Sequence, residues 1–423
     1  MTQSADNIRE ALVKMGEKAV AASRALAVLA PDAKTACIRR MADELEVSAP
    51  EILKANAEDV KKAVANGLSS AMVDRLTIGD KGIRNMAEGL RAVAGQTDPV
   101  GRVLSSTIRP NGLKIEKVTV PIGVIAIIYE SRPTVTSDAA GICLKAGNAV
   151  ILRGGSEALA SNRAIAAALN RAAVLCGIPD GAVQLIPWTG HEAVNMMLKM
   201  DKYIDLVIPR GGERLIRAVM AESTIPVIKH YKGVCHLFVD RDCDFDMALK
   251  VVENAKCQRP GTCNALETLL IDREAADKFL PMLVERMAAR GVELRGGPEF
   301  CKRVPSAKEA SEEDFYNEYL DLKLSCRIVD GVKQAVEHIN HYGSKHSDGI
   351  LTRSQERADY FLANVDSSTV YHNASTRFTD GGEFGLGAEI GISTDKLHAR
   401  GPMGANELVS TKFIVHGDGQ TRQ

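Results

Sequence analysis

The stretch "PIGVIAIIYESRPTVTSDAAGICLKAGNAVILRGGSEA", residues 121–158, contains two apolar runs on either side of a helical pattern. The first run, "IGVIAIIY", is continuously apolar, which is typical of a strand that is buried on both faces of a parallel sheet. A helix is predicted over about 134–145, and "AVILR" at 149–153 is predicted as the next strand. This order of strand, helix and strand predicts a βαβ unit.

Alternating strands and helices continue toward the C-terminus in two series. The first series predicts further strands at "AVQLIP", "IDLVIP", "PVIKH" and "VCHLFVD", which are residues 182–187, 204–209, 226–230 and 234–240. The second series, from about 248 to 370, predicts strands at "ALETLLID", "SCRIVD" and "DGILT", with helices between them. The fold class is therefore predicted as α/β, with two α/β domains that contain Rossmann-type parallel sheets.

Two regions before residue 121 have a different character. The segment 31–67 has the periodicity of two amphipathic helices that are broken near Pro50. The segment "RVLSSTIRPNGLKIEKVTVPIG", residues 102–123, predicts a hairpin, because the pair Asn111-Gly112 accepts positive φ at both turn positions. An isolated hairpin is only marginally stable, so we expect it to pair with another sheet, such as one of a second subunit. An ordinary surface hairpin stays open as the alternative.

Composition and charge narrow the classes of function. The chain has 423 residues, of which 45% are apolar and 25% are charged, as expected for a globular protein of two or three domains. The formal net charge of −1, without a strongly basic segment, argues against nucleic acid or a membrane as a partner. The sequence has no long apolar run, its start is polar, and its nine scattered cysteines predict reduced thiols. A cytoplasmic protein is therefore expected.

Two glycine turns follow predicted strands. The segments "LRGGSEA" and "IPRGGERLI", at 152–158 and 208–216, each place an arginine and two glycines before a helix. Glycine lets backbone N–H groups approach a phosphate, and the helix N-terminus adds a favourable dipole. Neither turn matches G-x-G-x-x-G or a P-loop, so a glycine turn beside a solvated arginine stays an alternative for each. Two such turns in one sheet favour a dinucleotide or phosphate ligand, with these candidate cofactor-binding residues: Arg153, Gly154, Gly155, Ser156, Arg210, Gly211 and Gly212.

Cys257 and Cys263 flank an Arg-Pro-Gly turn in "AKCQRPGTCNALE", residues 255–267. A zinc site would need a second pair of ligands at matching spacing, and the sequence offers none. A loop-to-strand position for Cys263, with Lys256 and Arg259 nearby to favour a thiolate, would suit a nucleophile. From these residues alone, a core thiol and a nucleophile both stay open.

Three histidines, His338, His341 and His346, lie close together in "HINHYGSKH". Zinc sites favour histidines at close spacing, but no glutamate stands at an H-E-x-x-H position, and the segment is a polar helix end. The three histidines are therefore predicted to be solvated, and no metal site is predicted.

Several segments together resemble the aldehyde dehydrogenase superfamily. They are "LKAGNAVILR" at 144–153, "GIPDGAVQLIPWTG" at 177–190, "GVCHLFVDRDCDFDMA" at 233–248 and "GTC" at 261–263. More narrowly, residues 127–158, 256–270 and 373–404 are similar to the branch of that superfamily that reduces γ-glutamyl phosphate. The resemblance covers nearly the whole chain and implies an aldehyde dehydrogenase-like fold with a small β element for oligomerisation.

The resemblance implies a division of the chain and a reaction. The implied parts are a cofactor-binding domain of 1–100, 121–232 and 387–403, a catalytic domain of 233–386, and an oligomerisation element of 101–120 and 404–423. The implied reaction reduces γ-glutamyl phosphate to glutamate 5-semialdehyde with release of phosphate, which is a step of proline synthesis from glutamate. NADP(H) is the implied cofactor, and no metal is implied.

The resemblance also implies roles for individual residues. Cys263 falls at the family's nucleophile and would form a thioester, which makes Cys257 a bystander. Ser131 stands at the position of the family's oxyanion-binding asparagine, and the backbone N–H of Cys263 is the other donor. Arg377 is the candidate for the substrate carboxylate, because a guanidinium binds a carboxylate with two hydrogen bonds; a structural ion pair stays its alternative. The candidate substrate-binding residues are Asn373, Ser375, Thr376 and Arg377.

Two further departures from the superfamily have a physical meaning. His230 takes the place of the glutamate that activates water in aldehyde-oxidising members, which suits an enzyme whose thioester must not be hydrolysed. Arg153 replaces a lysine, and Ser156 stands where NAD-preferring members often carry a glutamate. Loss of that carboxylate removes repulsion against a 2′-phosphate, so NADPH is predicted over NADH. The unranked candidates for the substrate phosphate are Lys256, Arg259 and Arg132.

Two rival interpretations remain. A coenzyme-A-acylating or simple aldehyde dehydrogenase is the nearer one, and His230 argues against the hydrolytic kind. A non-catalytic scaffold is the other, for example one that holds glutamate kinase, and the intact "GTC" argues against it. The hairpin and the strand "LVSTKFIVH" match the family's oligomerisation elements, so we expect a homo-oligomer that is at least a dimer. Whether the substrate is channelled from glutamate kinase stays open.

Overall fold

The computed structural model describes residues 5–422, which divide into two compact units. The first unit consists of Met1–Lys229, Gly385–Gly391 and Met403–Gln423, and the second of His230–Phe384 and Ile392–Pro402. Residues 1–4 and 423, which the predicted domains include, lie outside the described part of the chain.

The glycine-rich stretch near the C-terminus is shared between the units. The predicted cofactor-binding domain includes all of 387–403, whereas Ile392–Pro402 belongs to the second unit. Ion pairs of Lys396 and Arg400 with Asp366, at 2.8 and 2.9 Å, attach this segment to the second unit. Its two short strands pair with each other and are β14 (Gly391–Ser393) and β15 (Gly401–Met403).

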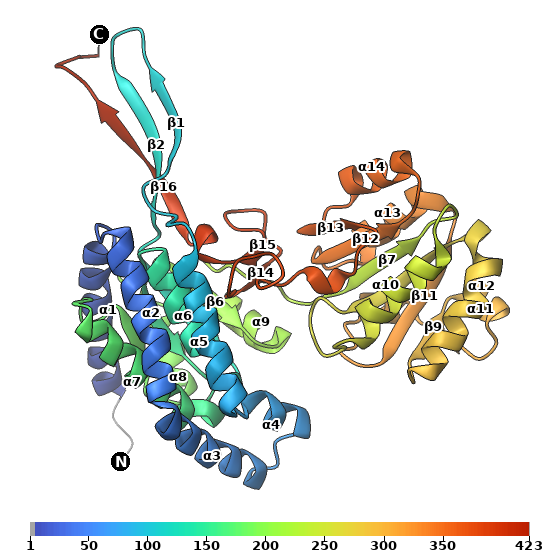
Figure 1. Ribbon diagram of the computed structural model, residues 1–423, viewed down its shortest axis with the longest axis horizontal. Helices are drawn as coiled ribbons and strands as arrows, with labels where there is room; N and C mark the ends of the chain where they lie inside the picture. The colour runs from blue at the N-terminus through green and yellow to red at the C-terminus, as the bar shows by residue number, and fades with distance from the viewer. Residues whose placement is uncertain (1–4, 423) are drawn as a thin grey trace. The chain divides into compact units, whose positions relative to one another are not determined.

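Helices form the N-terminal part of the first unit. They are α1 (Ala5–Leu26), α2 (Pro31–Val47), α3 (Ala49–Ala65), α4 (Ser70–Leu76) and α5 (Asp80–Gly95). In Figure 1, α2 and α5 lie side by side with α6 (Val135–Lys145). The helix pair predicted in 31–67 is confirmed, with its break at Ser48. Pro50 lies in the first turn of α3, where its missing N–H costs no helical hydrogen bond.

A four-stranded parallel sheet of order β5-β4-β3-β6 is the centre of the first unit. Its strands are β3 (Val124–Tyr129), β4 (Ala149–Arg153), β5 (Val183–Leu185) and β6 (Leu206–Arg210), and its other helices are α7 (Leu159–Leu175), α8 (His191–Met197) and α9 (Glu213–Glu222). All of β3 is buried, which confirms the strand expected from the continuous apolar run. After β3 the chain forms β4 and then β5 on one side of β3, and it then crosses to form β6 on the other side of β3. The carboxyl ends of these strands therefore border a topological switch point, where such sheets bind ligands.

One predicted strand of the first series is wrong. In "PVIKH", residues 226–230, only Val227 pairs with another strand, through a single bridge to Val207. The preceding Pro226 has no N–H to donate to a ladder, so the pairing is not extended.

The second unit contains a seven-stranded sheet of order β10-β9-β11-β8-β7-β12-β13, in which all neighbours are parallel. The strands are β7 (Cys235–Val239), β8 (Leu266–Asp272), β9 (Glu293–Gly296), β10 (Lys308–Glu309), β11 (Lys323–Val329), β12 (Ser347–Leu351) and β13 (Thr369–His372). The helices are α10 (Phe245–Cys257), α11 (Arg273–Ala289), α12 (Pro298–Arg303), α13 (Gly331–Tyr342) and α14 (Gln355–Asn364). Leu237 and Val239 pack in the core under α10 and α11, and Phe238 packs in the opposite core under α13 and α14. Both faces are thus covered, as a parallel sheet requires.

A three-stranded antiparallel sheet of order β1-β2-β16 extends from the helices of the first unit (Figure 1). Its strands are β1 (Val103–Ile108), β2 (Lys114–Pro121) and β16 (Val409–His416). The predicted hairpin is confirmed, but the predicted positive φ at both turn positions is found only at Gly112, with a φ of 89°, and not at Asn111. The N–H of Gly112 donates to the carbonyl of Arg109 at 2.8 Å, so the turn differs from the two-residue turn expected of an Asn-Gly pair.

None of the described helices combines the length and the apolar character that a membrane span needs.

Candidate active site

The amino ends of three adjacent strands in the seven-stranded sheet carry one reactive side chain each. Cys263 lies in the loop that enters β8, His230 in the segment that leads to β7, and His346 directly before β12. The thiol sulfur and one ring nitrogen of each histidine all lie within 4.8 Å of one another. Cys263 and His230 are half-buried, whereas His346 is fully buried. After a small side-chain rotation, either imidazole can accept the thiol proton.

The Cys263 loop is fixed by contacts on several sides. A Cβ atom at Gly233 would lie 1.8 Å from the carbonyl oxygen of Cys263, so only glycine lets the two backbones pack this closely. The thiol of Cys235 donates to the same carbonyl oxygen at 3.2 Å. Thr376 Oγ1 donates to the carbonyl oxygen of Asn264 at 2.7 Å. The position of the thiol is thus set by Gly233 just before β7, by the side chain of Cys235 at the start of β7, and by the segment after β13.

A hydrogen-bonded chain orients His346. Its Nδ1 lies 2.8 Å from Oγ of Ser347, which lies 2.6 Å from Oγ1 of Thr379. The hydroxyl of Tyr371 lies 2.7 Å from the same Thr379 oxygen. The ring of His230 packs against that of His346 in a T-shaped arrangement, with centroids 5.6 Å apart. Because Nδ1 is held by Ser347, the Nε2 atom is left as the reactive nitrogen of His346.

Two guanidinium groups lie beside the Cys263 loop. Arg377 donates through Nε to Oε1 of Gln258 at 2.8 Å and through Nη1 to the side-chain oxygen of Asn264. Burial and the neighbouring charge of Arg259 lower the pKa of Arg377. Arg259 itself is exposed. Two adjacent cations give this edge of the sheet a charge that suits an anionic substrate.

Lys256 is not available to a ligand in this arrangement. It is completely buried, and its Nζ forms an ion pair at 2.7 Å with Glu267, which is also completely buried. Burial raises the pKa of Glu267 to about 7, and the ammonium group of Lys256 opposes that shift. Of the three candidates for the substrate phosphate, Arg259 is therefore the one that the structure places on the surface of the Cys263 loop, and Arg132 belongs to the first unit.

The other nearby thiols have environments that suppress the thiolate. Cys257, the last residue of α10, packs against the core between α10 and α11, and burial together with Glu253 raises its pKa. Burial and the charge of Asp348 raise the pKa of Cys235 well above its ordinary value. Cys263 is therefore the best placed of these cysteines for a nucleophile, because the thiolate is the reactive form.

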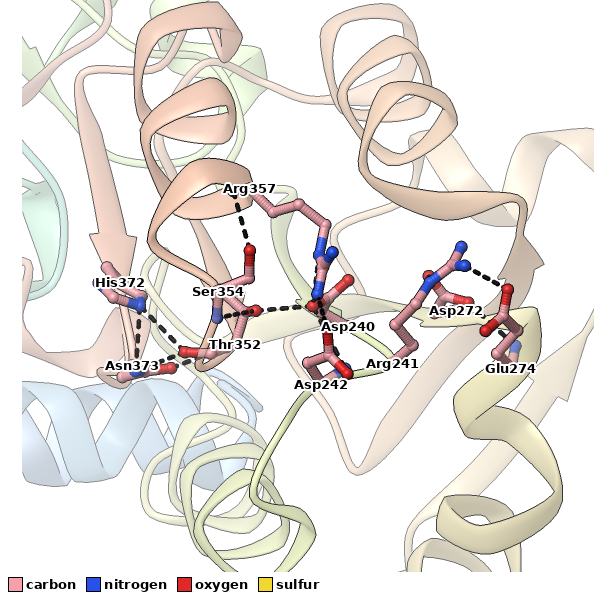
Figure 2. Close-up of polar contacts among 10 residues, drawn as sticks. All are labelled: Asp240, Arg241, Asp242, Asp272, Glu274, Thr352, Ser354, Arg357, His372 and Asn373. Carbon is pink, nitrogen blue, oxygen red and sulfur yellow. Dashed lines mark hydrogen bonds and ion pairs between the residues drawn. The ribbon is translucent and has the colours of Figure 1, made fainter.

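The predicted substrate residues fall into two groups. Thr376 and Arg377 contact the Cys263 loop as described, and Ser375 accepts a hydrogen bond from the N–H of Arg377 in the same short 3₁₀ turn, η3 (Thr376–Phe378). Asn373 instead lies at the carboxyl end of β13, where its amide donates to the carbonyl of Thr352 and accepts from its N–H, both at 2.9 Å (Figure 2). The side chain of Asn373 thus closes the strand end and does not face the thiol.

The carboxyl edge of the same sheet is occupied by charged side chains that pair with one another. Figure 2 shows Asp240, which follows β7, accepting from Thr352 Oγ1 at 2.6 Å and from Arg357 Nε at 2.8 Å. Arg241 pairs with Asp272 at 3.0 Å in the same view. Asp240 and Asp272 are fully buried. This edge, where open parallel sheets usually bind ligands, is closed by ion pairs.

The prediction that the three histidines of 338–346 are solvated is wrong for two of them. His341 is exposed, but His338 faces the sheet and packs against the rings of His236 and Phe315. His346 is buried because it directly precedes β12, all of whose residues are buried. Because the segment is polar, its sequence did not indicate that His338 and His346 are buried.

In the first unit, the predicted cofactor turns meet at the carboxyl edge of the four-stranded sheet. Arg153 is the last residue of β4 and is followed by Gly154 and Gly155, and Arg210 is the last residue of β6 and is followed by Gly211 and Gly212. The turn after β3 joins them: the N–H of Glu130 donates to the carbonyl of Arg210 at 3.1 Å. The switch point of this sheet therefore collects all the predicted cofactor-binding residues, together with Ser131.

Acidic side chains of the first unit engage the turns. The N–H of Gly212 donates to Glu130 at 2.9 Å, and a Cβ atom at Gly211 would lie 2.4 Å from that carboxylate. The N–H and Oγ of Ser131 both donate to Glu157, at 2.8 and 2.6 Å. Ser131 has a φ of 34°, which only a well-supported turn maintains in a residue other than glycine. Its hydroxyl would have to leave Glu157 before it could donate to an oxyanion.

Arg153 is the cation of the first turn. Its Nη2 donates to the carbonyl of Thr189 at 2.8 Å, and its buried Nε has no hydrogen-bond partner among the described residues. Burial lowers the pKa of Arg153. Ser156 nearby is exposed and borders a cavity of about 470 Å³ that Lys62 and Arg163 also line. A buried guanidinium nitrogen without a partner fits an anionic ligand such as a nucleotide phosphate.

Sequence reasoning missed Cys235 and His346 as neighbours of the thiol. The signal that could have found them is positional: "CHLFV", "LETLLID" and "SDGIL" are parallel strands, and their amino ends share one edge. Reactive side chains just before such strands are brought together, whatever their separation along the chain.

A thiol between imidazoles on one α/β unit, and glycine turns at the switch point of another, define an oxidoreductase of the aldehyde dehydrogenase type. The sequence profile of the aldehyde dehydrogenase family matches residues 2–300. The chain belongs to the aldehyde dehydrogenase family.

Within that family, the similar relatives bear the name γ-glutamyl phosphate reductase. That of Caldanaerobacter subterraneus is 54% identical over 96% of this chain and 98% of its own, and that of Thermodesulfovibrio yellowstonii is 52% identical over 98% and 100%. The crystal structure of the Thermotoga maritima γ-glutamyl phosphate reductase matches with a TM-score of 0.95 at 45% identity, over 97% of this chain and 100% of that one. These matches confirm the resemblance seen in the sequence.

Proposed function

We propose that the chain reduces γ-glutamyl phosphate to glutamate 5-semialdehyde, with NADPH as reductant and a thioester on Cys263 as intermediate. The reaction would be the second step of proline synthesis from glutamate. The observation that carries the proposal is the meeting of Cys263 with His230 and His346 in a chain whose relatives, at 52–54% identity, are named for this reduction.

The chain's own groups support each chemical task. Transfer of the thiol proton to His346 or His230 leaves the Cys263 thiolate, which attacks the acyl carbon and expels phosphate. The backbone N–H of Cys263 donates to the oxyanion, and Ser131 is the second candidate donor. The nicotinamide cofactor supplies the hydride that converts the thioester to the aldehyde. The protonated imidazole can return its proton to the departing sulfur, which restores the thiol.

The cations beside the thiol divide the binding of the substrate. Arg377 is positioned on the Cys263 loop through Asn264 and Gln258, and a guanidinium suits the α-carboxylate. Arg259, which is exposed on the same loop, suits the leaving phosphate. The glutamate that activates water in aldehyde-oxidising members is replaced by His230, which lies beside the thiol and takes part in its proton transfer. The carboxylate that orients hydrolytic water in those members is thus not part of this site, so the thioester survives until reduction.

The cofactor preference rests on Arg153 and Ser156. The buried Nε of Arg153, which has no hydrogen-bond partner among the described residues, favours a 2′-phosphate. The cavity beside Ser156 is lined by Lys62 and Arg163 but also by Asp59 and Glu157, so the preference rests on Arg153 and on Ser156 in place of a carboxylate. Ser156→Glu should therefore lower kcat/KM for NADPH relative to NADH by about tenfold, the effect of about 1.4 kcal/mol of repulsion. Steady-state kinetics with both cofactors measure the ratio, and wild-type kcat/KM that is equal or higher with NADH would contradict the preference.

The decisive assay runs the reaction in reverse. Reduction of NADP⁺ by glutamate 5-semialdehyde should depend on inorganic phosphate, because phosphate is the acceptor of the acyl group. Coenzyme A in place of phosphate should give no turnover. Turnover with coenzyme A, or with neither acceptor, would instead favour a coenzyme-A-acylating or a hydrolytic aldehyde dehydrogenase.

Self-association is supported by the exposed antiparallel sheet. Its solvent-facing apolar residues are Val103, Leu104, Ile108, Phe413 and Val415. Phe413 and Val415 share one face of the sheet, and Ile108 lies on the other. Exposed apolar side chains on a sheet of this kind are typical of a subunit interface. Sedimentation should show at least a dimer, and a monomer at micromolar concentration would contradict this part of the proposal. Glutamate kinase stays a candidate partner only if it co-sediments.

A further inference from the structure

Three side chains at the amino edge of the seven-stranded sheet have the composition of a zinc site. One nitrogen of His230, the sulfur of Cys263 and one nitrogen of His346 all lie within 4.8 Å of one another. We propose that these three residues bind Zn²⁺ reversibly, and that the bound ion holds the Cys263 sulfur and blocks its use as a nucleophile.

The geometry needs only a small contraction to reach coordination. Ligand atoms around tetrahedral zinc lie about 3.3–3.8 Å apart, given bonds of about 2.0 Å to nitrogen and 2.3 Å to sulfur. The three atoms here are at most 4.8 Å apart, and Cys263 and His230 are only half-buried, so the contraction does not have to come from the fully buried His346. The ligands come from the segments that enter three neighbouring strands, β8, β7 and β12, so the fold brings them together although they lie far apart in the sequence.

His346 is prepared for the role of anchoring ligand. A metal-binding histidine usually has its second nitrogen in a hydrogen bond that fixes the ring. The Nδ1 of His346 has such a bond to Ser347, which is bonded in turn to Thr379, so Nε2 would bind the metal. Cys235, whose sulfur is 3.7 Å from that Nδ1, is turned to the carbonyl of Cys263 and lies outside the ligand set.

The donor set selects the class of ion. One thiolate and two imidazoles favour Zn²⁺ and its analogue Co²⁺, whereas Mg²⁺ and Ca²⁺ require oxygen ligands. Coordination forms the metal–sulfur bond and releases the thiol proton to solvent, so binding should tighten as pH rises. Three protein ligands leave a fourth position for water or for an oxygen of the substrate.

Cobalt is the probe for the site. The full-length protein, reduced and freed of metal with EDTA and then desalted, is titrated with Co²⁺. We expect one Co²⁺ per chain, with a thiolate-to-cobalt charge-transfer band and the intense visible bands of tetrahedral cobalt. Zn²⁺ should displace these bands, and in a turnover assay Zn²⁺ should inhibit and EDTA should restore activity.

Matched variants locate the ion. Cys263→Ser should abolish the charge-transfer band, while Cys257→Ser and Cys301→Ser, which alter two other half-buried thiols, should keep it. His230→Gln should weaken Co²⁺ binding at least about 100-fold, and Ser347→Ala about tenfold, as loss of a supporting hydrogen bond does. A band that persists in Cys263→Ser, or unchanged affinity in His230→Gln, would overturn the proposal. Circular dichroism confirms that each variant is folded.

The proposed metal site and the proposed function can be refuted independently of each other. Cobalt binding is read from spectra, without turnover, so it stands even if the chain does not reduce γ-glutamyl phosphate. Only the inhibitory effect rests on Cys263 being the nucleophile. Reductase activity without a cobalt band would refute the metal site and leave the proposed function intact.

Discussion

The two edges of the seven-stranded sheet differ in chemistry. The carboxyl edge carries the charged pairs of Figure 2, in which Asp240 and Asp272 are buried and bonded to Arg357 and Arg241. The amino edge carries Cys263 among imidazoles, with exposed Arg259 on its loop. At one edge the charges neutralise one another, whereas the other edge has a half-buried thiol and an exposed guanidinium group, that of Arg259.

The first unit shows the opposite arrangement. Its glycine turns and Arg153 lie at the carboxyl edge of the four-stranded sheet, which is the usual place for a ligand in a parallel sheet. The usual rule therefore holds for the cofactor turns and fails for the thiol. The general lesson is that a site is found by which groups are left unneutralised, and strand direction alone does not locate it.

The largest effect should come from the amino edge. Cys263→Ala should reduce turnover by about 10⁴-fold or more, since loss of a nucleophile removes the covalent route, and the fold should stay intact. Steady-state kinetics and circular dichroism measure both. Cys257→Ala is the matched control and should keep most of the activity, because that thiol packs against the core. An inactive Cys257→Ala control beside an active Cys263→Ala variant would reverse the assignment.

A change at the carboxyl edge should act on stability. Asp240→Asn removes the buried charge that Arg357 and Thr352 contact and should lower the free energy of unfolding by about 2–3 kcal/mol. This is less than for a wholly buried pair, because the side chain of Arg357 is 26% exposed. Urea titration measures the loss. A fall in kcat/KM of the folded variant would show that the two edges are not separate.

An arginine substitution made once at each edge sharpens the contrast. Arg377→Lys should raise KM for glutamate 5-semialdehyde about tenfold and lower kcat less, because lysine cannot form the paired hydrogen bonds of a guanidinium. Arg357→Lys should lower the melting temperature and leave KM unchanged. An unchanged KM in Arg377→Lys would leave that residue with a structural role on the Cys263 loop.

The smallest expected effect is the pH dependence of stability that arises from the buried His338. Burial, with the charges of His236, Arg327 and His341, lowers the pKa of His338 to about 2, so it stays neutral in the folded state. An unfolded histidine binds a proton below its ordinary pKa of 6.5. Stability is therefore lost as pH falls below 6.5, by up to about 1.4 kcal/mol per pH unit for this group.

His338→Gln should reduce that slope between pH 6.5 and 5, because glutamine does not titrate there. Urea titrations at several pH values measure the slope, and the pH profile of kcat/KM should be unchanged. A shifted activity profile would mean that His338 is coupled to the histidines at the thiol.

The sequence predicted most of the central strands correctly, for physical reasons. The strands β3, β8 and β12 are buried throughout because both faces of a parallel sheet are covered. The hairpin was found because its turn needs a glycine with positive φ at position 112. The nucleophile stays a prediction. Cys263 was one of two open cysteines until the family resemblance was added. The glycine turns were found because their spacing after strands is local.

What escaped prediction depends on contacts between distant segments. The sequence places His346 in a polar stretch, but in the structure this residue is buried because it directly precedes a central strand. Lys256 reads as a free cation, and its partner Glu267 is on the next strand. Asn373 was predicted to be a substrate-binding loop residue, but its amide is hydrogen-bonded to Thr352 at the end of the neighbouring strand β12. Such pairings follow from strand order, which local patterns do not encode.

The most direct test of the amino-edge nucleophile is to isolate the acyl-enzyme. The protein is incubated with glutamate 5-semialdehyde and NADP⁺ in the absence of phosphate, digested at low pH and analysed by mass spectrometry. We predict that the peptide with Cys263 gains one glutamyl group and that added phosphate removes it. A glutamyl group on another residue, or none on Cys263 while NADP⁺ is reduced, would contradict the account.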